Sequence, residues 1–310
     1  MTTDSRSSSV SPARYRSVLR PGLFAGEVHW VTGGGSGIGR CVAHELAALG
    51  ATVVVSGRTS EKLARVAAEI AEDGGRAVTC AFDIRDEDAV KAAVAGVVAE
   101  HGRVHGLVNN AGGQFPALLH AISKRGFESV LANNLTGGFL MAREVFVQSM
   151  RRHGGAIVNM TADMWKGMPG MGHSGAARAG MANLTKTAAV EWASCGVRVN
   201  AVAPGWIASS GLDTYDDAVK ALIPQLPKLV PLHRLGLEAE VSSAICFLLS
   251  EGAAFITGVT LAIDGGAPLW TPLLPDAGKG RSEPYAGFHR ATVPAVLRDA
   301  DADPAREDDC

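Results

Sequence analysis

The stretch Thr32-Gly33-Gly34-Gly35-Ser36-Gly37-Ile38-Gly39 decides the fold of this chain. An apolar run at residues 28–32 precedes it, and a segment of helical period at residues 40–49 follows it. In such a unit Gly33 permits the tight turn, Gly37 lets the backbone approach a pyrophosphate, and Gly39 allows close packing of helix on strand. Free amides and the helix dipole then bind the anion. We expect a dinucleotide site, the alternative being a glycine-rich turn without a ligand; its residues are Gly33, Gly35, Ser36, Gly37, Ile38 and Gly39.

Short apolar runs alternate with helical segments through the middle of the chain. The runs lie at residues 28–32, 52–56, 77–81, 104–109, 156–160, 197–202 and 260–263. The helical segments lie at residues 40–49, 62–71, 88–99, 127–150 and 175–193. This alternation predicts an α/β fold, a single Rossmann-type doubly wound parallel sheet with helices on both faces. Ligands of such sheets bind beyond the carboxyl ends of the strands, where we expect the site.

Composition excludes several classes of protein. The 29 basic and 31 acidic side chains nearly cancel, which argues against binding to nucleic acid or to an anionic membrane. No apolar run approaches the roughly 18 residues of a membrane span. The five cysteines are scattered and never in Cys-x-x-Cys spacing, so we expect no metal site and a cytoplasmic location.

The domain organisation follows from the two ends of the chain. Residues 1–24 begin with a Ser/Thr/Arg-rich stretch and predict a flexible N-terminal arm. Residues 273–310 predict a polar C-terminal tail, for which we also expect poor order. The Rossmann-fold domain is expected between them, at residues 25–272, with a substrate lid at residues 206–235.

The end of the second apolar run bears on cofactor choice. A site that prefers NAD(H) places Asp or Glu there, against the ribose hydroxyls. Here Gly57 fills that position and Arg58 follows it, which favours the 2′-phosphate of NADP(H). NAD(H) stays possible, because Arg58 has the alternative of being an ordinary solvated loop residue.

Six motifs, by their order and spacing, resemble the short-chain dehydrogenase/reductase (SDR) superfamily over about residues 24–270. They are the glycine stretch, Asp83, Asn109-Asn110-Ala111-Gly112, Asn134, Pro204-Gly205 and Asp264-Gly265-Gly266. The resemblance implies that Asp83 contacts the adenine, that Asn134 holds a water near the active site, and that residues 204–207 line the nicotinamide. The cofactor residues it implies, beyond the glycine stretch and Arg58, are Asp83, Ile84, Asn110, Ala111, Gly112, Arg178, Pro204, Gly205 and Ile207.

A narrower likeness points to two groups within one branch. Residues 109–116 (NNAGGQFP), 173–180 (HSGAARAG) and 183–186 (NLTK) resemble the peroxisomal-type trans-2-enoyl-CoA reductases. Residues 162–165 (ADMW), 167–172 (GMPGMG) and 205–210 (GWIASS) are similar to bacterial citronellol/citronellal dehydrogenases. Both groups are oxidoreductases, so the likeness implies that class of enzyme and leaves the substrate open.

The proton donor typical of the superfamily is missing. Most members carry Tyr-x-x-x-Lys on the helix after the fifth strand, where the lysine lowers the tyrosine pKa. The only tyrosines here are Tyr15, Tyr215 and Tyr285. In one register Ser174 and Arg178 take the two positions; a second register ends at Lys186 and places Ala182 at the tyrosine.

Three interpretations follow from this loss. In the first, hydride chemistry survives with another acid: Ser174 and Arg178 share a helical face, His173 beside them is a second candidate to supply the proton, and Asp163 follows the fifth strand. Thr161 matches the serine that hydrogen-bonds the substrate oxygen in the superfamily. In the second, the chain binds cofactor but is only weakly active. In the third, Tyr215 folds over the site as a displaced donor.

The substrate is expected to be an apolar small molecule. Reduction of a C=C bond conjugated to a thioester tolerates loss of the tyrosine better than oxidation of an alcohol does, because the latter needs a base at the hydroxyl. An enoyl-CoA therefore comes first and a terpenoid alcohol such as citronellol second. The lid mixes apolar residues with Lys220, Lys228, His233 and Arg234, which suits a phosphate-rich head or an ordinary solvated surface. The resemblance also implies a homotetramer.

Overall fold

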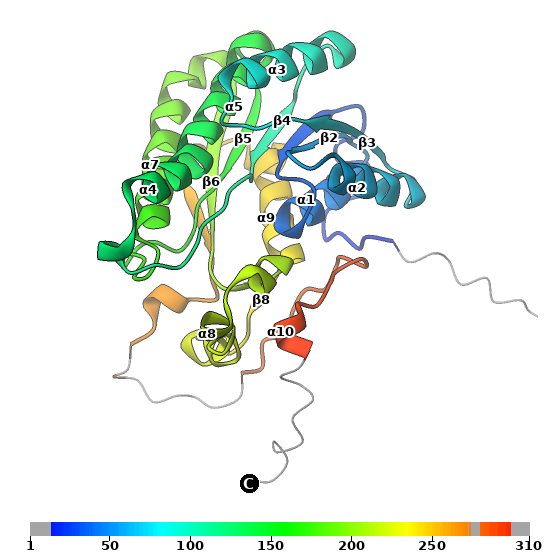
Figure 1. Ribbon diagram of the computed structural model, residues 1–310. Coiled ribbons are helices and arrows are strands. Elements are labelled where there is room, and N and C mark those ends of the chain that lie inside the picture. The colour runs from blue at the N-terminus through cyan, green and yellow to red at the C-terminus, as the bar shows by residue number, and fades with distance from the viewer. Residues whose placement is uncertain (1–13, 272, 274–279, 299–310) are drawn as a thin grey trace, which may run out of the picture.

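The computed structural model describes residues 14–271, 273 and 280–298. Seven parallel strands form one sheet in the order β3-β2-β1-β4-β5-β6-β9 (Figure 1). Their bounds are β1 Val28–Thr32, β2 Thr52–Gly57, β3 Arg76–Ala81, β4 Gly106–Asn109, β5 Gly155–Met160, β6 Val197–Pro204 and β9 Thr260–Ile263. The predicted doubly wound parallel sheet is confirmed.

The strand order reverses between β1 and β4. Val31 of β1 pairs with Val55 of β2 on one side and with Val108 of β4 on the other. Chain connections leave in opposite directions from this point, so the loops after β1 and β4 diverge and open a crevice at the carboxyl edge. Every residue of β1 is buried, as expected for a central strand covered on both faces.

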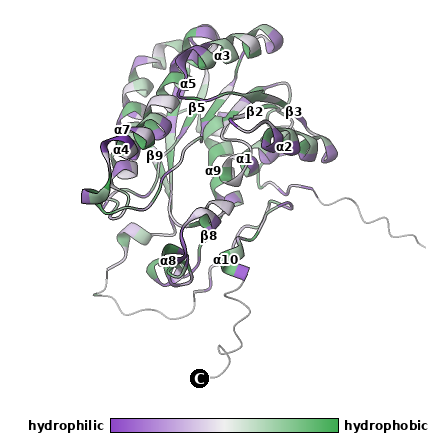
Figure 2. Ribbon diagram, in the orientation of Figure 1, coloured by the Kyte–Doolittle hydropathy of each residue, from purple (hydrophilic) through white to green (hydrophobic). Residues whose placement is uncertain are grey.

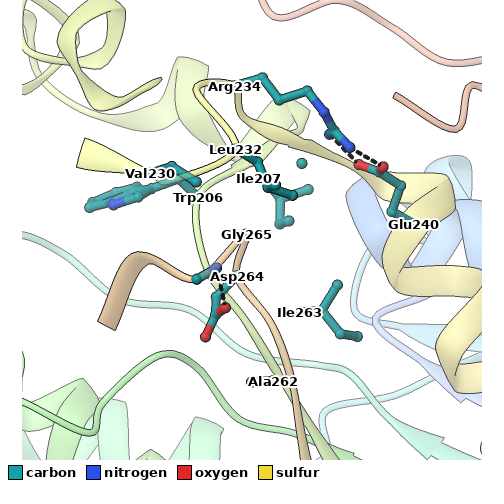
Figure 3. Close-up of a pocket in the computed structure, with 12 residues that line it drawn as sticks. Trp206, Ile207, Val230, Leu232, Arg234, Glu240, Ala262, Ile263, Asp264 and Gly265 are labelled. Carbon is teal, nitrogen blue, oxygen red and sulfur yellow. Dashed lines mark hydrogen bonds and ion pairs between the residues drawn. The ribbon is translucent and has the colours of Figure 1, made fainter. Parts of the chain in front are cut away.

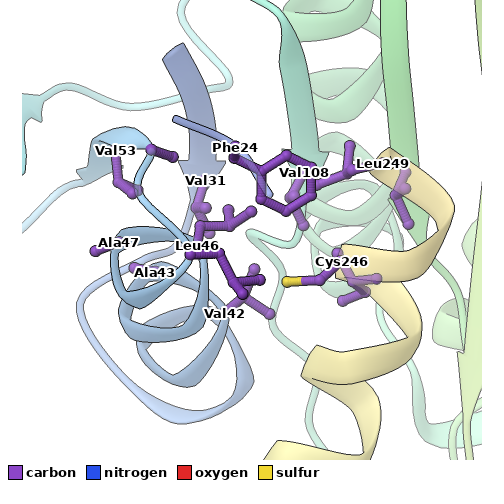
Figure 4. Packing of buried hydrophobic residues seen from close by; sticks show 14 of the residues in the cluster. Phe24, Val31, Val42, Ala43, Leu46, Ala47, Val53, Val108, Cys246 and Leu249 are labelled. Atoms are coloured by element: carbon purple, nitrogen blue, oxygen red, sulfur yellow. The ribbon is translucent and has the colours of Figure 1, made fainter. Parts of the chain in front are cut away.

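Helices cover both faces of the sheet. On one face lie α1 Gly37–Ala48, α2 Ser60–Glu72 and α9 Glu238–Leu249, where Val42 and Leu46 of α1 pack with Cys246 of α9 (Figure 4). On the other lie α3 Glu87–His101, α5 Gly137–Val145 and α7 Gly172–Glu191. Strands β2 and β5 are mostly green in Figure 2, whereas α2 alternates between purple and green, which is the pattern of a helix with one buried face.

The long helix before β5 is interrupted twice. It begins with α4 Lys124–Leu131, passes through a π-helical turn at Ala132–Thr136 into α5, and reaches α6 Arg151–His153 through a second π-helical turn at Phe146–Met150. Such π turns often occur at functional positions. The first of them carries Asn134.

The segment after β6, residues 206–235, is the one expected to act as a lid and is called the lid below. It contains β7 Ile207–Ala208, the 3₁₀ helix Ser210–Thr214, α8 Asp217–Lys220 and the 3₁₀ helix Ile223–Leu229. Strand β8 Gly236–Leu237 pairs with β7 and leads into α9.

The described parts of the two terminal segments pack against the domain, which differs from the expected arm and tail. Tyr15 and Phe24 are buried, and Phe288 is buried with its ring 5.7 Å from that of Tyr15. Arg290 forms an ion pair with Asp73 at the end of α2. The chain then ends its described course in α10 Ala295–Arg298, beside the lid (Figure 1). Residues 1–13 and 299–310 lie outside the described residues.

Within the described ranges, no helix is long and apolar enough to cross a membrane. No group of His, Cys, Asp and Glu side chains with the arrangement of a metal site occurs in this part of the chain.

Candidate active site

The glycine turn after β1 has the backbone that a phosphate cradle needs. Gly33 and Gly37 have φ angles of +65° and +56°, in the left-handed region that favours glycine. A Cβ on Gly39 would lie 2.4 Å from the Gly33 carbonyl oxygen, so only glycine lets α1 approach the turn this closely. The predicted packing role of Gly39 therefore has a direct steric basis, and Gly39 itself lines no cavity described below.

Hydrogen bonds among Thr32, Asn110 and Ala111, called the polar latch below, join this turn to the loop after β4. The Thr32 hydroxyl accepts hydrogen bonds from the backbone amides of Asn110 and Ala111, both at 3.0 Å. The Asn110 side chain donates to the Thr32 carbonyl oxygen at 3.0 Å. These bonds fix the crevice at the reversal of strand order.

The far end of the crevice is a small pocket of about 170 Å³. Gly57, Arg58 and Lys62 line one side of it, and Asp83 and Ile84 line the other. The Asp83 carboxylate accepts hydrogen bonds from Arg85, which lowers the pKa of that carboxyl. Lys62 is a second cation here that the motifs miss, although its place in the first turn of α2 and four residues after Arg58 is a usable signal.

A larger cleft of about 710 Å³ continues from this pocket along the carboxyl edge of the sheet. It brings together predicted residues from the glycine turn and from the ends of β4, β5 and β6. Those that line it are Gly33, Ser36, Gly37, Ile38, Asn110, Ala111, Gly112, Thr161, Asp163, Arg178, Pro204, Gly205 and Ile207. Gln114, Ser209, Ser210 and Tyr215 line it as well.

Asn134 lies behind the loop that follows β4. Its Oδ1 accepts a hydrogen bond from the Gly113 amide at 2.8 Å. Its Nδ2 is buried without a partner among the described residues. A buried unpartnered donor of this kind suits an ordered water, which is the role that the resemblance implies for Asn134.

Arg178 lies at the position that the resemblance assigns to the lysine of the missing motif. It is buried, and Nη1 donates to the Met160 carbonyl oxygen at 2.7 Å, while Nε has no partner within the described chain. A Cβ on Gly112 would lie 2.7 Å from Nη2, so the glycine makes room for the guanidinium. Burial lowers the Arg178 pKa to about 10, which leaves it charged at neutral pH.

Ser174, at the position that the resemblance assigns to the tyrosine, is fully buried and is not among the cleft-lining residues, but it belongs to a chain of polar side chains. Its hydroxyl donates to Gln114 Oε1 at 2.6 Å, and Gln114 Nε2 donates to the Tyr215 hydroxyl oxygen at 3.2 Å. The alternative register fails on geometry, because Lys186 is exposed and is not among the residues that line the cleft. Gln114 has no counterpart in the catalytic residues expected from the sequence.

Two other predicted residues are engaged by the protein itself. His173 is fully buried against Phe115, with ring centroids 4.4 Å apart, and it is not among the cleft-lining residues. Its Nδ1 accepts from the Ser174 amide at 2.8 Å. The Thr161 hydroxyl donates to the Val202 carbonyl oxygen at 2.8 Å. Asp163 differs: it lines the cleft, and burial together with the charge of Asp264 raises its pKa.

A side cavity of about 490 Å³ lies where the lid meets the end of β9 (Figure 3). Trp206 and Ile207 line both this cavity and the main cleft. At its edge Arg234 binds Glu240 through two hydrogen bonds of 2.8 and 2.7 Å. Glu240 also accepts from the Leu237 amide, so this pair fastens the lid to the start of α9.

The glycine cradle, the polar latch and the cleft at the strand reversal define a dinucleotide-binding enzyme of the Rossmann type. The chain belongs to the short-chain dehydrogenase/reductase superfamily of oxidoreductases, which use nicotinamide cofactors. A family model described as enoyl-(acyl carrier protein) reductase matches residues 33–268.

Individual relatives carry different substrates in their names. The peroxisomal 2,4-dienoyl-CoA reductase of Danio rerio is 34% identical over 82% of this chain and 85% of its own. The 3-oxoacyl-[acyl-carrier-protein] reductase FabG of Staphylococcus aureus is 37% identical over 76% of this chain and 96% of its own. The structure of the citronellol catabolism dehydrogenase AtuB of Pseudomonas aeruginosa PAO1 is 62% identical, with a TM-score of 0.74, over 82% of this chain and 99% of that one.

Proposed function

We propose that this protein is an NADP(H)-dependent reductase of the conjugated C=C bond of a trans-2-enoyl thioester. The observation that carries the proposal is the buried Arg178 at the cleft, in the position that the resemblance assigns to the lysine, while Ser174 is fully buried and contacts the cleft-lining Gln114. A buried guanidinium suits an oxygen that gains negative charge. It supplies no strong base at a substrate hydroxyl.

The residues of the cradle fit a dinucleotide. The positive φ angles of Gly33 and Gly37 and the open space above Ser36 leave backbone amides free for a pyrophosphate. When bound, the reduced nicotinamide supplies a hydride to the β carbon. Arg178 then stabilises the enolate charge electrostatically, and Asn134 holds a water behind the loop after β4.

The preference for NADP(H) rests on charge at the small pocket. Gly57 offers no carboxylate to the ribose hydroxyls, and both Arg58 and Lys62 line the pocket. Asp83, the acid that lines the same pocket, is paired with Arg85, so Arg58 and Lys62 suit a 2′-phosphate. NAD(H) remains the alternative cofactor.

A second candidate is oxidation of an acyclic terpenoid alcohol such as citronellol. It is favoured by the 62% identity to a protein named for citronellol catabolism. In that reaction Asp163, whose pKa burial raises, is the cleft-lining carboxylate available as a base.

Turnover assays separate these reactions. NADPH absorbance is followed with 2-octenoyl-CoA and with 2,4-decadienoyl-CoA, and NADP⁺ reduction is followed with citronellol. Turnover of a thioester supports the first proposal, and turnover of the alcohol alone overturns it in favour of the second. If none of the three reacts although NADPH binds, the weakly active interpretation replaces both.

A matched pair of variants tests the site. Arg178→Met is expected to lower kcat by about a hundredfold or more, the usual cost of removing an oxyanion donor. Lys186 lies on the same helix and is the lysine of the alternative register. Lys186→Met is expected to leave kcat unchanged. Equal effects of the two variants would contradict the assignment.

We also propose a homotetramer. Val147 and Val190 are more than half exposed on the helical side, and Val259 and Leu261 are partly exposed at the β9 edge of the sheet. Apolar groups on two separate faces suit two kinds of subunit contact. Light scattering tests this, since a monomer at micromolar concentration would contradict it.

A further inference from the structure

We propose that Tyr215, held by Gln114, donates the proton in this reaction and so replaces the tyrosine missing from α7. The inference rests on the proposed oxidoreductase function and names the acid of the same site. Tyr215 comes from the lid, 41 residues beyond Ser174 in the sequence, yet the two hydroxyls are joined through a single side chain.

The direction of the hydrogen bonds decides which hydroxyl is the acid. Each hydroxyl carries one proton. Ser174 uses its proton to donate to Gln114 Oε1. Tyr215 accepts from Gln114 Nε2, and it donates in none of the hydrogen bonds of the described residues, so its own proton stays available to the cleft. Ser174 therefore orients the amide, and Tyr215 has the transferable proton.

The lid holds the Tyr215 ring in place from behind. The ring packs against a cluster formed by Leu212, Ile223, Leu226 and Leu235, and this cluster is buried. Val296 and Leu297 of α10 pack against the same cluster. The Val296 amide also donates to Asp213 Oδ1 at 3.4 Å. The C-terminal segment of this chain thus supports the lid residue that faces the cleft.

The proton transfer balances with the hydride step. Hydride addition forms a C–H bond at the β carbon, and the π electrons of the C=C bond move into the enolate. The O–H bond of Tyr215 then breaks, and its proton forms the C–H bond at the α carbon. Gln114 Nε2 stabilises the resulting phenolate by donating to it. Tyr215 is only half-buried, so water returns the proton.

Three variants test the assignment. Tyr215→Phe removes only the hydroxyl and is expected to lower kcat by about a hundredfold or more, with NADPH affinity unchanged. Gln114→Glu keeps an acceptor for Ser174 but places a carboxylate beside the phenol, so kcat falls and its pH dependence shifts to higher pH. Tyr285→Phe is the control, because that ring lies in the C-terminal segment outside the cleft. Wild-type kcat and pH profile in Tyr215→Phe would overturn the inference.

Phenolate absorbance, measured as the pH is raised, tests the environment of Tyr215 without substrate turnover. Burial raises the pKa of Tyr285 to about 12 and raises that of Tyr15 as well. The phenolate absorbance of Tyr215 is identified as the part of the titration that vanishes in Tyr215→Phe. NADP⁺ is expected to lower the pH at which it forms, since a cation in the cleft favours the phenolate, and Gln114→Glu should raise it.

The two readouts keep the failures apart. Absence of turnover with all probes refutes the proposed function, and the phenolate titration then judges the inference alone. If neither NADP⁺ nor Gln114→Glu changes the pH at which the phenolate forms, Tyr215 faces neither the cofactor nor Gln114. That result overturns the inference even if the enzyme is active.

Discussion

Replacement of Glu238 by glutamine is expected to flatten the pH dependence of folding stability. Glu238 is the first residue of α9 and is only 7% exposed. Burial raises the pKa of its carboxyl to about 7, and the charge of Arg40 offsets this only in part. Between the unfolded and the folded pKa, the folded chain therefore holds a proton on this carboxyl that the unfolded chain has already released.

The magnitude follows from the two pKa values. The ordinary glutamate value is 4.5 and the folded value is about 7, so the difference corresponds to about 3 kcal/mol. Below pH 4.5 both states are protonated and the contribution is fully present. Stability is then lost as the pH rises from 4.5 through about 7, after which it is level. Glu238→Gln removes this loss, so the variant gains about 3 kcal/mol relative to wild type between pH 4.5 and pH 8.

Urea unfolding at several pH values measures this difference, because other titrating groups cancel between the two proteins. Glu251→Gln is the matched control, since the Glu251 side chain is 78% exposed and paired with an exposed arginine. It should run parallel to wild type. If Glu238→Gln also runs parallel to wild type, the carboxyl is not held protonated by burial and the reasoning fails.

Four further outcomes are expected. NADPH affinity should fall above about pH 7 in wild type but less in Glu238→Gln, because Glu238 Oε1 lies 3.9 Å from the Cβ position of Gly37 in the phosphate cradle; parallel affinity curves would contradict this. Phe288→Ala should cost about 3 kcal/mol or more in urea unfolding, since it empties a buried aromatic site, and a loss below about 1 kcal/mol would mean that the C-terminal segment does not pack as described. Arg58→Ala should weaken NADPH about tenfold and leave NADH unchanged in fluorescence titrations, whereas equal losses would remove the basis for an NADP(H) preference. Gly39→Ala should lower the melting temperature and abolish NADPH binding, because the added methyl would lie 2.4 Å from the Gly33 carbonyl oxygen; wild-type binding would refute that steric argument.

The sheet could be predicted from the sequence because its strands are buried on both faces. Such strands appear as short continuous apolar runs, and all seven predicted runs overlap observed strands, with β1 and β9 matching at both ends. Helix α9 was not predicted from hydrophobic periodicity, because it too is buried on several sides and shows no single apolar face. It lies against α1 and the sheet, and buried apolar or small residues occur on several of its sides.

The site was predictable where a motif is local and not where it is assembled. Gly33 to Gly39 and the Ser174–Arg178 pair are fixed by spacing within one turn or one helix. No sequence motif marks Lys62 or Gln114. Their place in the site depends on the pocket that Lys62 lines and on the two hydroxyls that Gln114 contacts. The sequence likewise proposes Asp163 and His173 on equal terms, whereas the fold opens the first to the cleft and buries the second.

By itself the sequence determined where the strands lie, where the glycine turn lies and that the usual tyrosine is lost, because each depends on neighbours a few residues apart. Only the tertiary structure decided that Gln114 lies between Ser174 and Tyr215, since those contacts span 60 and 101 residues. It also decided that the terminal segments pack on α1 through the rings of Tyr15 and Phe288. A single contact between distant residues produces no hydrophobic periodicity in either segment. Burial that depends on such contacts is therefore seen only in the folded structure.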